Sequence, residues 1–362
     1  MAPERIRVGV VGTSWWADLE HLPGLRARGD VEVAALCGRD PEKLRALAAK
    51  HGVRRTETDW RALLAGGLDA LVVATPNATH HAIASAALDA GLHVICEKPL
   101  AMTAALARDL AARARARRRA ALTFYTYRTV GAAAQVGRLV ARGVLGTPLT
   151  AVASYATGSQ LRPGKPLSWK MRRAEAGTGA LGDIGSHVID LARWWIGDLS
   201  AVTAQWQVAA VAREGGVADA DDATAFLARF ASGAQGVFHA TKLAAGRENF
   251  QRVELHGTQA QIVYEAAPGN DASWEGRVLV GRPGESRLEP VPLDPDLAAG
   301  LAGVPERASR DEAYRRLTDP FFAAVRRGGG DVSPGFEDGA AIQAVLDAVA
   351  RSAEEGRWVS VE

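Results

Sequence analysis

The order of short apolar runs in the first 125 residues constrains the fold of this chain most. Runs rich in Val, Ile, Leu and Ala alternate with segments of helical spacing, and they lie at 6–11, 31–37, 69–74, 93–95 and 121–125. Continuous apolar runs without polar alternation are typical of parallel strands buried on both faces. The repeated order of strand and helix therefore predicts an α/β fold with a doubly wound parallel sheet.

The segments between these strands have the length and the end signals of helices. Helices are predicted at 41–51, at 60–65 as a short turn, from the residues after 75 to Ala90, and at 101–119. Gly91 follows the third of these, as a glycine often does at the end of a helix. The arginine-rich end of the last helix is interpreted as a solvated helix terminus, since cations favour that end of the helix dipole.

A glycine turn follows the first strand, where a parallel sheet of this kind binds a dinucleotide. The turn reads Gly12-Thr13-Ser14-Trp15-Trp16-Ala17 and leads into a helix. Backbone N–H groups at such a helix start receive a pyrophosphate. Gly12 and Ala17 fit the small positions of the G-x-G-x-x-A pattern, whereas Ser14 replaces the second glycine. We predict a cofactor turn here, with the serine hydroxyl as an additional donor.

The end of the second strand bears on which dinucleotide binds. An acidic residue at this place holds the ribose hydroxyls of NAD. Here the chain reads Cys37-Gly38-Arg39-Asp40, and the fork of Arg39 suits a 2′-phosphate. The sequence therefore favours NADP over NAD. Alternatively, Arg39 is a solvated loop residue and Asp40 caps the next helix.

The stretch Cys96-Glu97-Lys98-Pro99-Leu100 places a carboxylate and an ammonium where the strand at 93–95 ends. Proline restricts the residue before it, so Lys98 is held extended. The carboxyl end of such a strand is where α/β sheets bind ligands. The alternative is a surface Glu-Lys pair at a strand end.

The pattern changes after residue 125, which suggests domains at 1–125 and 126–362. A helix is predicted at 132–142, a strand at 149–156, and a loop at 157–168 that is either a substrate loop or a plain connection. Sequential strands with hairpin turns favour a mostly antiparallel sheet in an α+β domain. These strands are predicted at 200–211, 223–231, 235–244, 249–256, 260–266 and 276–281, followed by helices at 311–327 and 336–355 and a short strand at 358–361.

A glycine-rich segment at 177–182 leads into a predicted helix that carries Asp183 and His187 and runs to Trp195. Residues four apart share one face of a regular helix, with Cβ atoms roughly 6 Å apart. A carboxylate and a histidine are costly to bury on a largely apolar helix without a purpose. The alternative is a helix cap at Asp183 and a hydrogen-bonded core histidine.

Composition excludes several classes of function. The formal net charge of +2 gives no general case for a nucleic-acid partner. The two cysteines, Cys37 and Cys96, form no metal or disulfide pattern, which suits a cytoplasmic protein. His80 and His81 are adjacent and do not share a helix face, so no metal site is predicted. No signal peptide is expected at the N-terminus, and no apolar run approaches 18 residues, so no membrane span is expected.

These motifs together resemble the Gfo/Idh/MocA oxidoreductases, nearly from end to end. The resemblance rests on the Gly12 turn with His21-Leu22-Pro23, Thr75-Pro76-Asn77 with His80, Ala90-Gly91-Leu92-His93-Val94 leading to Glu97-Lys98-Pro99, Gly179-Ala180-Leu181 with Asp183, His187 and Asp190, and Asp338-Gly339 with Ser352-Ala353. It implies an N-terminal Rossmann domain and a C-terminal domain with an open-faced sheet. It also implies hydride transfer between a nicotinamide and a carbon of a sugar or cyclitol, and a homodimer or homotetramer formed through that sheet.

The resemblance also implies which residues form the site. Lys98, Asp183 and His187 would be catalytic and would contact the substrate, together with Arg128. Trp169, which precedes Lys170 where relatives often carry Arg, would touch the cofactor. The other expected cofactor contacts are Gly12, Thr13, Ser14, Trp15, Arg39, Thr75, Pro76, Asn77, His80, Glu97 and Lys98.

Two other functions remain open from the sequence. Some relatives retain the nicotinamide and oxidise a sugar transiently in order to cleave a C–X bond. Others are non-catalytic sensors of NAD(P) or sugar. The presence of Lys98, Asp183 and His187 argues against a sensor.

Overall fold

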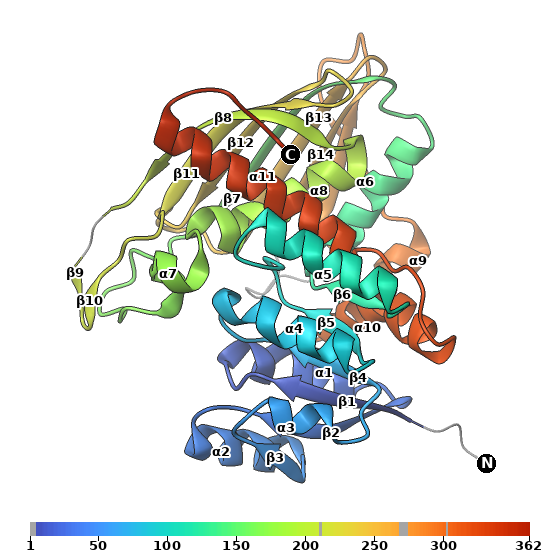
Figure 1. Cartoon of the computed structure of the whole chain (residues 1–362). Helices are drawn as coiled ribbons and strands as arrows, with labels where there is room; N and C mark the ends of the chain where they lie inside the picture. Colours follow the sequence, from blue (N-terminus) through green and yellow to red (C-terminus); the bar gives the residue numbers. More distant parts are fainter. Residues whose placement is uncertain (1–4, 210–211, 268–273, 302) are drawn as a thin grey trace. The chain divides into compact units, whose positions relative to one another are not determined.

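The computed structural model describes residues 5–209, 212–267, 274–301 and 303–362, and the chain divides into two compact units (Figure 1). The first unit runs to Tyr125 and includes Arg310–Ala340, while Thr126–Ser309 and Ala341–Glu362 form the second. The predicted boundary after residue 125 assigned Arg310–Ala340 to the second domain. In the structure, Tyr314 and Phe321 from this segment are buried in the core of the first unit, where their aromatic rings leave water.

The first unit is built on a six-stranded parallel sheet in the order β3-β2-β1-β4-β5-β6. This order places β1 between β2 and β4 and confirms the predicted doubly wound sheet. The short edge strand β3 was not predicted. The strands are β1 (Ile6–Val11), β2 (Val31–Cys37), β3 (Arg55–Glu57), β4 (Ala70–Val73), β5 (His93–Cys96) and β6 (Ala121–Thr123).

Each face of this sheet is covered by its own hydrophobic core. Val8 and Val10 of β1 belong to the core on one face, and Val11 belongs to the core on the other. Every residue of β4 and β5 is buried. A sheet covered on both faces is open to a ligand only at its strand ends.

Two predicted helix signals in the first unit are confirmed, whereas the helix predicted at 101–119 is shorter and spans Ala104–Ala116. Asp40 accepts hydrogen bonds from the backbone N–H of Glu42 and Lys43 at the start of α2, which confirms it as a helix cap. Gly91 lies just beyond α4 with a φ of 82°. The helical segments are η1 (Ala17–His21), α1 (Leu22–Arg26), α2 (Pro41–His51), α3 (Arg61–Leu64), η2 (Asn77–Thr79), α4 (His80–Asp89) and α5 (Ala104–Ala116).

The second unit contains a nine-stranded sheet in the order β16-β15-β14-β13-β7-β12-β11-β8-β17. All neighbours are antiparallel except β7 and β12, which confirms the prediction of a mostly antiparallel sheet. The predicted strand 200–211 ends at Gln207, and residues 210–211 lie outside the described residues. The strands are β7 (Pro148–Ala156), β8 (Leu199–Gln207), β11 (Ala223–Phe230), β12 (Gln235–Thr241), β13 (Phe250–Gly257), β14 (Gln261–Ala266), β15 (Arg277–Gly281), β16 (Glu289–Val291) and β17 (Val359–Ser360). A separate hairpin pairs β9 (Ala212–Arg213) with β10 (Gly216–Val217).

One face of this sheet is covered and the other is open. Burial alternates along β11, so that Phe226 is buried while Leu227 is 49% exposed. Phe226 stacks on Phe238 of β12 with ring centroids 4.6 Å apart. Helices α6 and α8 contact the sheet strands of this unit. The alternation is that of an antiparallel sheet with one face on a core.

The helix expected around Asp183 is not regular throughout. Leu181–Gly185 forms a π-helical turn, and the α-helix α8 starts only at Ser186. The predicted spacing of Asp183 and His187 on one regular α-helical face was therefore wrong, because a π turn is wider than an α turn. The remaining helical segments are η3 (Thr126–Thr129), α6 (Gly131–Ala141), η4 (Trp169–Met171), α7 (Arg173–Ala176), α8 (Ser186–Ile196), α9 (Pro295–Ala298), α10 (Glu306–Arg326) and α11 (Phe336–Glu355).

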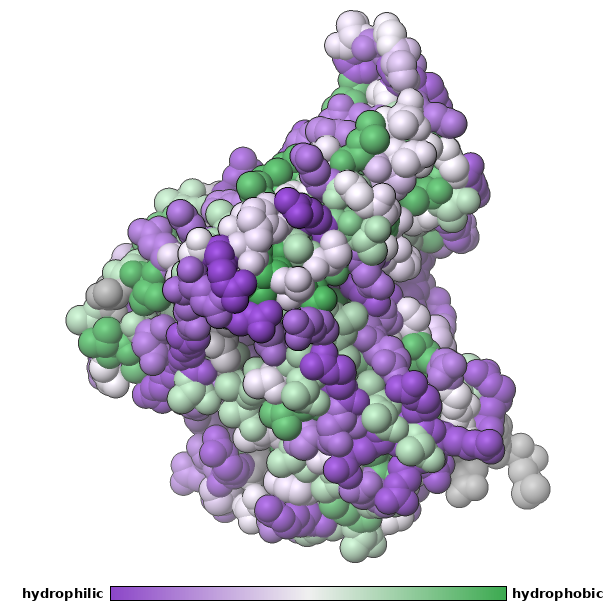
Figure 2. All heavy atoms as spheres, turned by 45° about the horizontal axis from the view of Figure 1, so that its top comes forward, coloured by the Kyte–Doolittle hydropathy of each residue, from purple (hydrophilic) through white to green (hydrophobic). Residues whose placement is uncertain are grey.

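No helix within the described ranges is long and apolar enough to cross a membrane. On the face shown in Figure 2, hydrophilic side chains predominate and apolar ones form scattered small areas.

Candidate functional site

The Gly12 turn is shaped by a close approach of two backbone segments. Gly12 has a φ of 134°, and its N–H donates to the carbonyl of Cys37 at 2.9 Å. A Cβ at this position would lie 2.1 Å from the carbonyl oxygen of Ala74, at the end of β4. Only glycine fits here. Ser14, two residues later, contributes only a weak contact to the turn. Its hydroxyl accepts a long hydrogen bond of 3.4 Å from the N–H of Ala17.

The end of β2 leaves one arginine available to a ligand. A Cβ on Gly38 would lie 2.4 Å from Cγ2 of Thr13, so a side chain here would displace the Thr13 side chain in the glycine turn. Arg39 is exposed and makes no hydrogen bond or ion pair within the described part of the chain. The neighbouring Asp40 is occupied as the cap of α2. The turn thus presents a guanidinium and no carboxylate that is free to take a ribose.

His80 connects the loops after β4 and β5. Its ring is fully buried, with Nδ1 2.9 Å from the carbonyl oxygen of Pro99 and Nε2 2.9 Å from that of Thr75. Burial lowers the pKa of His80, although the two carbonyl oxygens act in the opposite direction. His80 therefore links the Thr75-Pro76-Asn77 loop to the loop that carries Lys98.

Glu97 is held by side chains from the first helical segment. One of its oxygens accepts from the Trp16 indole N–H at 2.7 Å and lies 2.9 Å from Nε2 of His21. Burial alone would raise the pKa of Glu97, but the hydrogen bonds from His21 and Trp16, with the charges of His21 and Lys98, hold it below the ordinary value. The other carboxylate oxygen accepts from the backbone N–H of Lys98 at 3.2 Å. These contacts fix the backbone that carries Lys98, and they favour a structural role for Glu97.

In the second unit, Asp183 lies between two lysines. Lys170 Nζ is 2.8 Å from one of its oxygens, and Lys242 Nζ is 3.1 Å from the other. The Lys242 side chain is only 4% exposed, and its ammonium also donates to the carbonyl of Gly179 at 3.3 Å. The sequence reasoning missed Lys242. Its position directly after the apolar strand β12 was the available signal.

His187 lies among aromatic rings at the start of α8. It is 5% exposed, with its ring centroid 4.4 Å from that of Tyr127 and 6.2 Å from that of Tyr155. The hydroxyls of Tyr127 and Tyr155 are 2.8 Å apart, and Tyr155 donates to Asn249 Oδ1 at 3.0 Å. Burial and the neighbouring Tyr127 raise the pKa of Tyr155 well above its ordinary value, so its phenol stays protonated. Neither tyrosine was predicted.

Arg128 is occupied by an ion pair. It is 8% exposed, and its guanidinium Nε lies 2.9 Å and 3.1 Å from the two carboxylate oxygens of Asp190, on α8. Such a bidentate pair orients both groups. Arg128 therefore anchors α8, three residues beyond His187.

Trp169 lies in η4 beside Lys170, whose ammonium is 5.8 Å from the Trp169 ring centroid. Trp15, in the glycine turn of the first unit, is 63% exposed and packs edge-on against Trp16. Both tryptophans are thus partly accessible, as a contact with a cofactor ring requires.

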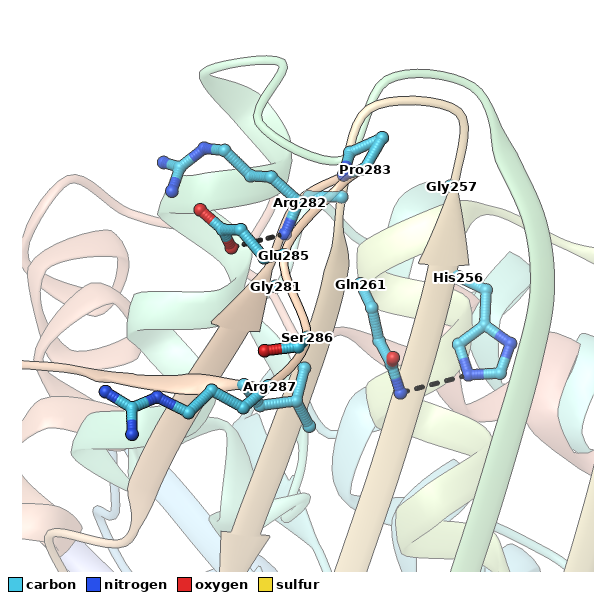
Figure 3. A pocket seen from close by; sticks show the side chains of 11 residues that line it. His256, Gly257, Gln261, Gly281, Arg282, Pro283, Glu285, Ser286 and Arg287 are labelled. Atoms are coloured by element: carbon cyan, nitrogen blue, oxygen red, sulfur yellow. Dashed lines mark hydrogen bonds between the residues drawn. The ribbon is translucent and has the colours of Figure 1, made fainter.

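An open hollow of about 380 Å³ lies at one end of the nine-stranded sheet (Figure 3). His256 and Gln261 face each other in it, while the side chains of Arg282 and Arg287 point outward. Strand β13 places His256 at the end away from Gln251, which pairs with Tyr155. The hollow is therefore separated from the tyrosines beside His187 by roughly five residues of strand, about 17 Å.

The described residues contain no group of His, Cys, Asp and Glu that could hold a metal ion. They do fit a dinucleotide. Gly12 lets the turn lie directly against the carbonyl of Ala74, at the carboxyl ends of β1 and β4, and the turn leads into η1. Gly12, Thr13 and Ser14 would hold the pyrophosphate there.

Comparisons with known proteins agree with this geometry. Residues 6–125 match the family model for an oxidoreductase family with an NAD-binding Rossmann fold, and residues 133–263 match that for a GFO/IDH/MocA C-terminal domain. Levoglucosan dehydrogenase of Pseudarthrobacter phenanthrenivorans is 32% identical over 351 residues, which cover 89% of this chain and 87% of that protein.

Two further similarities cover nearly the whole chain. The 1,5-anhydro-D-fructose reductase of Ensifer adhaerens is 30% identical over 365 residues, 98% of each chain. A structure of levoglucosan dehydrogenase in complex with NADH and levoglucosan has a TM-score of 0.87 and 30% identity, and the match covers 99% of this chain and 100% of that chain. The chain belongs to the Gfo/Idh/MocA family of oxidoreductases.

Proposed function

We propose that this protein, an NAD(P)-dependent oxidoreductase acting on a sugar or cyclitol, uses Lys98, Asp183 and His187 to move the proton that accompanies hydride transfer. When bound, the nicotinamide supplies or accepts the hydride. The proposal rests on how firmly these residues are held. Lys98 follows a strand end anchored by Glu97, Asp183 lies in the π turn before α8, and His187 lies at the start of α8.

Each of the three residues has a distinct role in this proposal. His187 takes the proton from the reacting hydroxyl, or returns it to the carbonyl oxygen, because imidazole titrates near neutral pH. Lys98 donates a hydrogen bond to the same oxygen and stabilises negative charge that develops there. Asp183, held by Lys170 and Lys242, accepts hydrogen bonds from sugar hydroxyls.

The cofactor turn supports NADP as the preferred dinucleotide. Arg39 is exposed and available, and Gly38 leaves no carboxylate to repel a 2′-phosphate. The levoglucosan dehydrogenase structure contains NADH, so a preference for NADP would distinguish this protein from that relative.

The test is a spectrophotometric screen of sugars, anhydrosugars and inositols, with NAD and NADP assayed separately. The expected result is turnover of at least one compound, with a lower KM for NADP. A strong preference for NAD would overturn our reading of Gly38 and Arg39. Binding of cofactor without turnover of any compound would instead favour the sensor, and product without net reduction would favour a retained nicotinamide.

We also propose a homodimer or homotetramer formed through the open face of the nine-stranded sheet. Across this face Thr203, Leu227, Val237 and Val152 form a row on four adjacent strands. Leu227 and Val237 are 49% and 42% exposed, which is unusual for paired apolar residues in the centre of a sheet. A cytoplasmic location is supported by the two buried free cysteines, Cys37 and Cys96.

A further inference from the structure

A cluster of cations in the second unit is larger than the mechanism requires. Lys170 and Lys242 share the carboxylate of Asp183, and one of the two would be sufficient to orient it. Two more cations, Lys165 and Arg213, belong to the same cluster through the loop at 157–168.

This loop is fastened to the strand end that carries Lys242. The N–H of Gln160 donates to the carbonyl of Lys242 at 3.0 Å, and the N–H of Thr157 donates to that of Thr241 at 2.9 Å. Arg213 Nη2 donates to the carbonyl of Gln160 at 2.7 Å, and its Nη1 donates to that of Lys165 at 3.1 Å. These contacts hold Gln160 and Lys165 close to the strand end that carries Lys242.

Of the three lysines in this cluster, Lys165 has the least negative charge beside it to balance its ammonium. It is half-buried, and it donates to the carbonyl oxygen of Ser159 at 2.8 Å. Burial, together with the charges of Lys242, Arg213 and Arg162, lowers the pKa of Lys165 to about 8 although Asp183 acts in the opposite direction. Cations thus outnumber carboxylates around this ammonium.

The neighbouring carboxylates are committed elsewhere. Asp221 accepts from the backbone N–H groups of Gly179 and Leu181, and Asp222 accepts from that of Ala209. Arg162 is exposed and pairs with Glu248. After these pairings, Lys165 and Arg213 remain as positive charges that contact backbone carbonyl oxygens. An anion would gain charge-assisted hydrogen bonds here.

We propose that the sugar substrate carries an anionic substituent, a carboxylate or a phosphate ester, which Lys165 binds while Asp183 holds the hydroxyls. This inference rests on the proposed function, because it names the substrate class of the same site. It also explains why two lysines flank Asp183, since a substrate anion next to a carboxylate would otherwise be repelled.

The test compares matched pairs of compounds on the holoenzyme: glucose, glucuronate and glucose 6-phosphate, and galactose with galacturonate. Lys165→Met is compared with Arg162→Met, which removes the same charge from the same loop at an exposed position. We expect kcat/KM for the preferred anionic compound to exceed that of its neutral counterpart by at least tenfold. Lys165→Met should raise its KM roughly ten- to hundredfold, while Arg162→Met leaves it within about twofold.

Equal or better turnover of the neutral sugars, with no effect of Lys165→Met on anionic ones, would overturn this inference and leave the proposed function intact. The uronate and phosphate arms distinguish the two sources of the anion. If no sugar is turned over, the proposed function fails, and calorimetric titration of the same compounds still decides the inference. Binding that is lost in Lys165→Met supports it, and absence of binding by the wild type rejects it.

Discussion

The two sheets of this protein present different surfaces to a ligand. The parallel sheet is buried on both faces, so its strand ends carry the glycine turn and Lys98. The nine-stranded sheet has one covered face, with α8 and His187 on the side of its core, and one open face with Leu227 and Val237 exposed. A sheet covered on both faces can bind a ligand only at its strand ends, whereas a sheet with one open face also has room for a partner.

The largest expected effect is a fall in kcat when a proposed catalytic residue of either unit is replaced. Lys98→Met and His187→Ala should each lower kcat by at least roughly a hundredfold, because each removes a group that acts on the reacting oxygen. Steady-state kinetics on the best sugar would measure this. His239→Ala, an exposed histidine on the open face of β12, and Lys43→Met, an exposed lysine on α2, are the controls. Near-normal turnover in either test variant would reject the role assigned to that residue.

The second prediction tests whether the first sheet depends on close backbone packing at its ends. Gly12→Ala should weaken cofactor binding at least tenfold and lower the free energy of unfolding by about 1–3 kcal/mol through strain. Gly52→Ala also places alanine at a positive φ, of 67°, but meets nothing within 4 Å. Fluorescence titration and chemical unfolding would compare the two. Equal losses of cofactor affinity in the two variants would show that the clash with the Ala74 carbonyl does not cause the loss in Gly12→Ala.

The third prediction concerns the charge at the end of β2. Arg39→Ala should raise the KM for NADP roughly tenfold and leave the KM for NAD nearly unchanged, since only NADP offers a phosphate to the guanidinium. Arg45→Ala, on the exposed side of α2, is the matched control. Parallel changes for both cofactors would contradict the assignment.

The fourth prediction tests the open face of the second sheet. Leu227→Asp should weaken self-association at least severalfold, because the charge would be buried opposite apolar residues of a second copy. Val217→Asp, on β10 outside the nine-stranded sheet, should not. Light scattering over a range of concentrations would measure the mass. A monomeric wild type would show that this face does not pair.

The smallest effect is expected for the pH dependence of stability. The pKa of Glu97 is held below its ordinary value of 4.5, so the unfolded chain binds this proton more readily than the folded protein does. The stabilisation is therefore fully present above about pH 4.5 and is lost as the pH falls through the lower folded value. Chemical unfolding between pH 6 and 3 should show a steeper decline in the wild type than in Glu97→Gln. Identical slopes would mean that Glu97 is not the group responsible.

Much of the fold was predictable because its signals are local. The helices at 41–51 and 336–355 have the predicted bounds, since capping residues and apolar spacing mark them within a few residues of sequence. The short strand β3 escaped prediction, because three residues leave too little pattern. Gly12 and Lys98 could likewise be identified because the residues next to them in the sequence mark a strand end.

What surrounds those residues depends on packing across long separations. Glu97 contacts Trp16 and His21, which are 81 and 76 residues away, and Lys242 reaches Asp183 from the end of β12. Side chains so distant in sequence meet only once the sheets have formed, and no periodicity encodes such a meeting. Local patterns in the sequence were enough to predict the alternation of the longer strands and helices and the glycine turn, and to single out the three candidate catalytic residues. The tertiary structure alone decided that Arg310–Ala340 packs on the first unit, that a π turn carries Asp183, and that lysines surround its carboxylate.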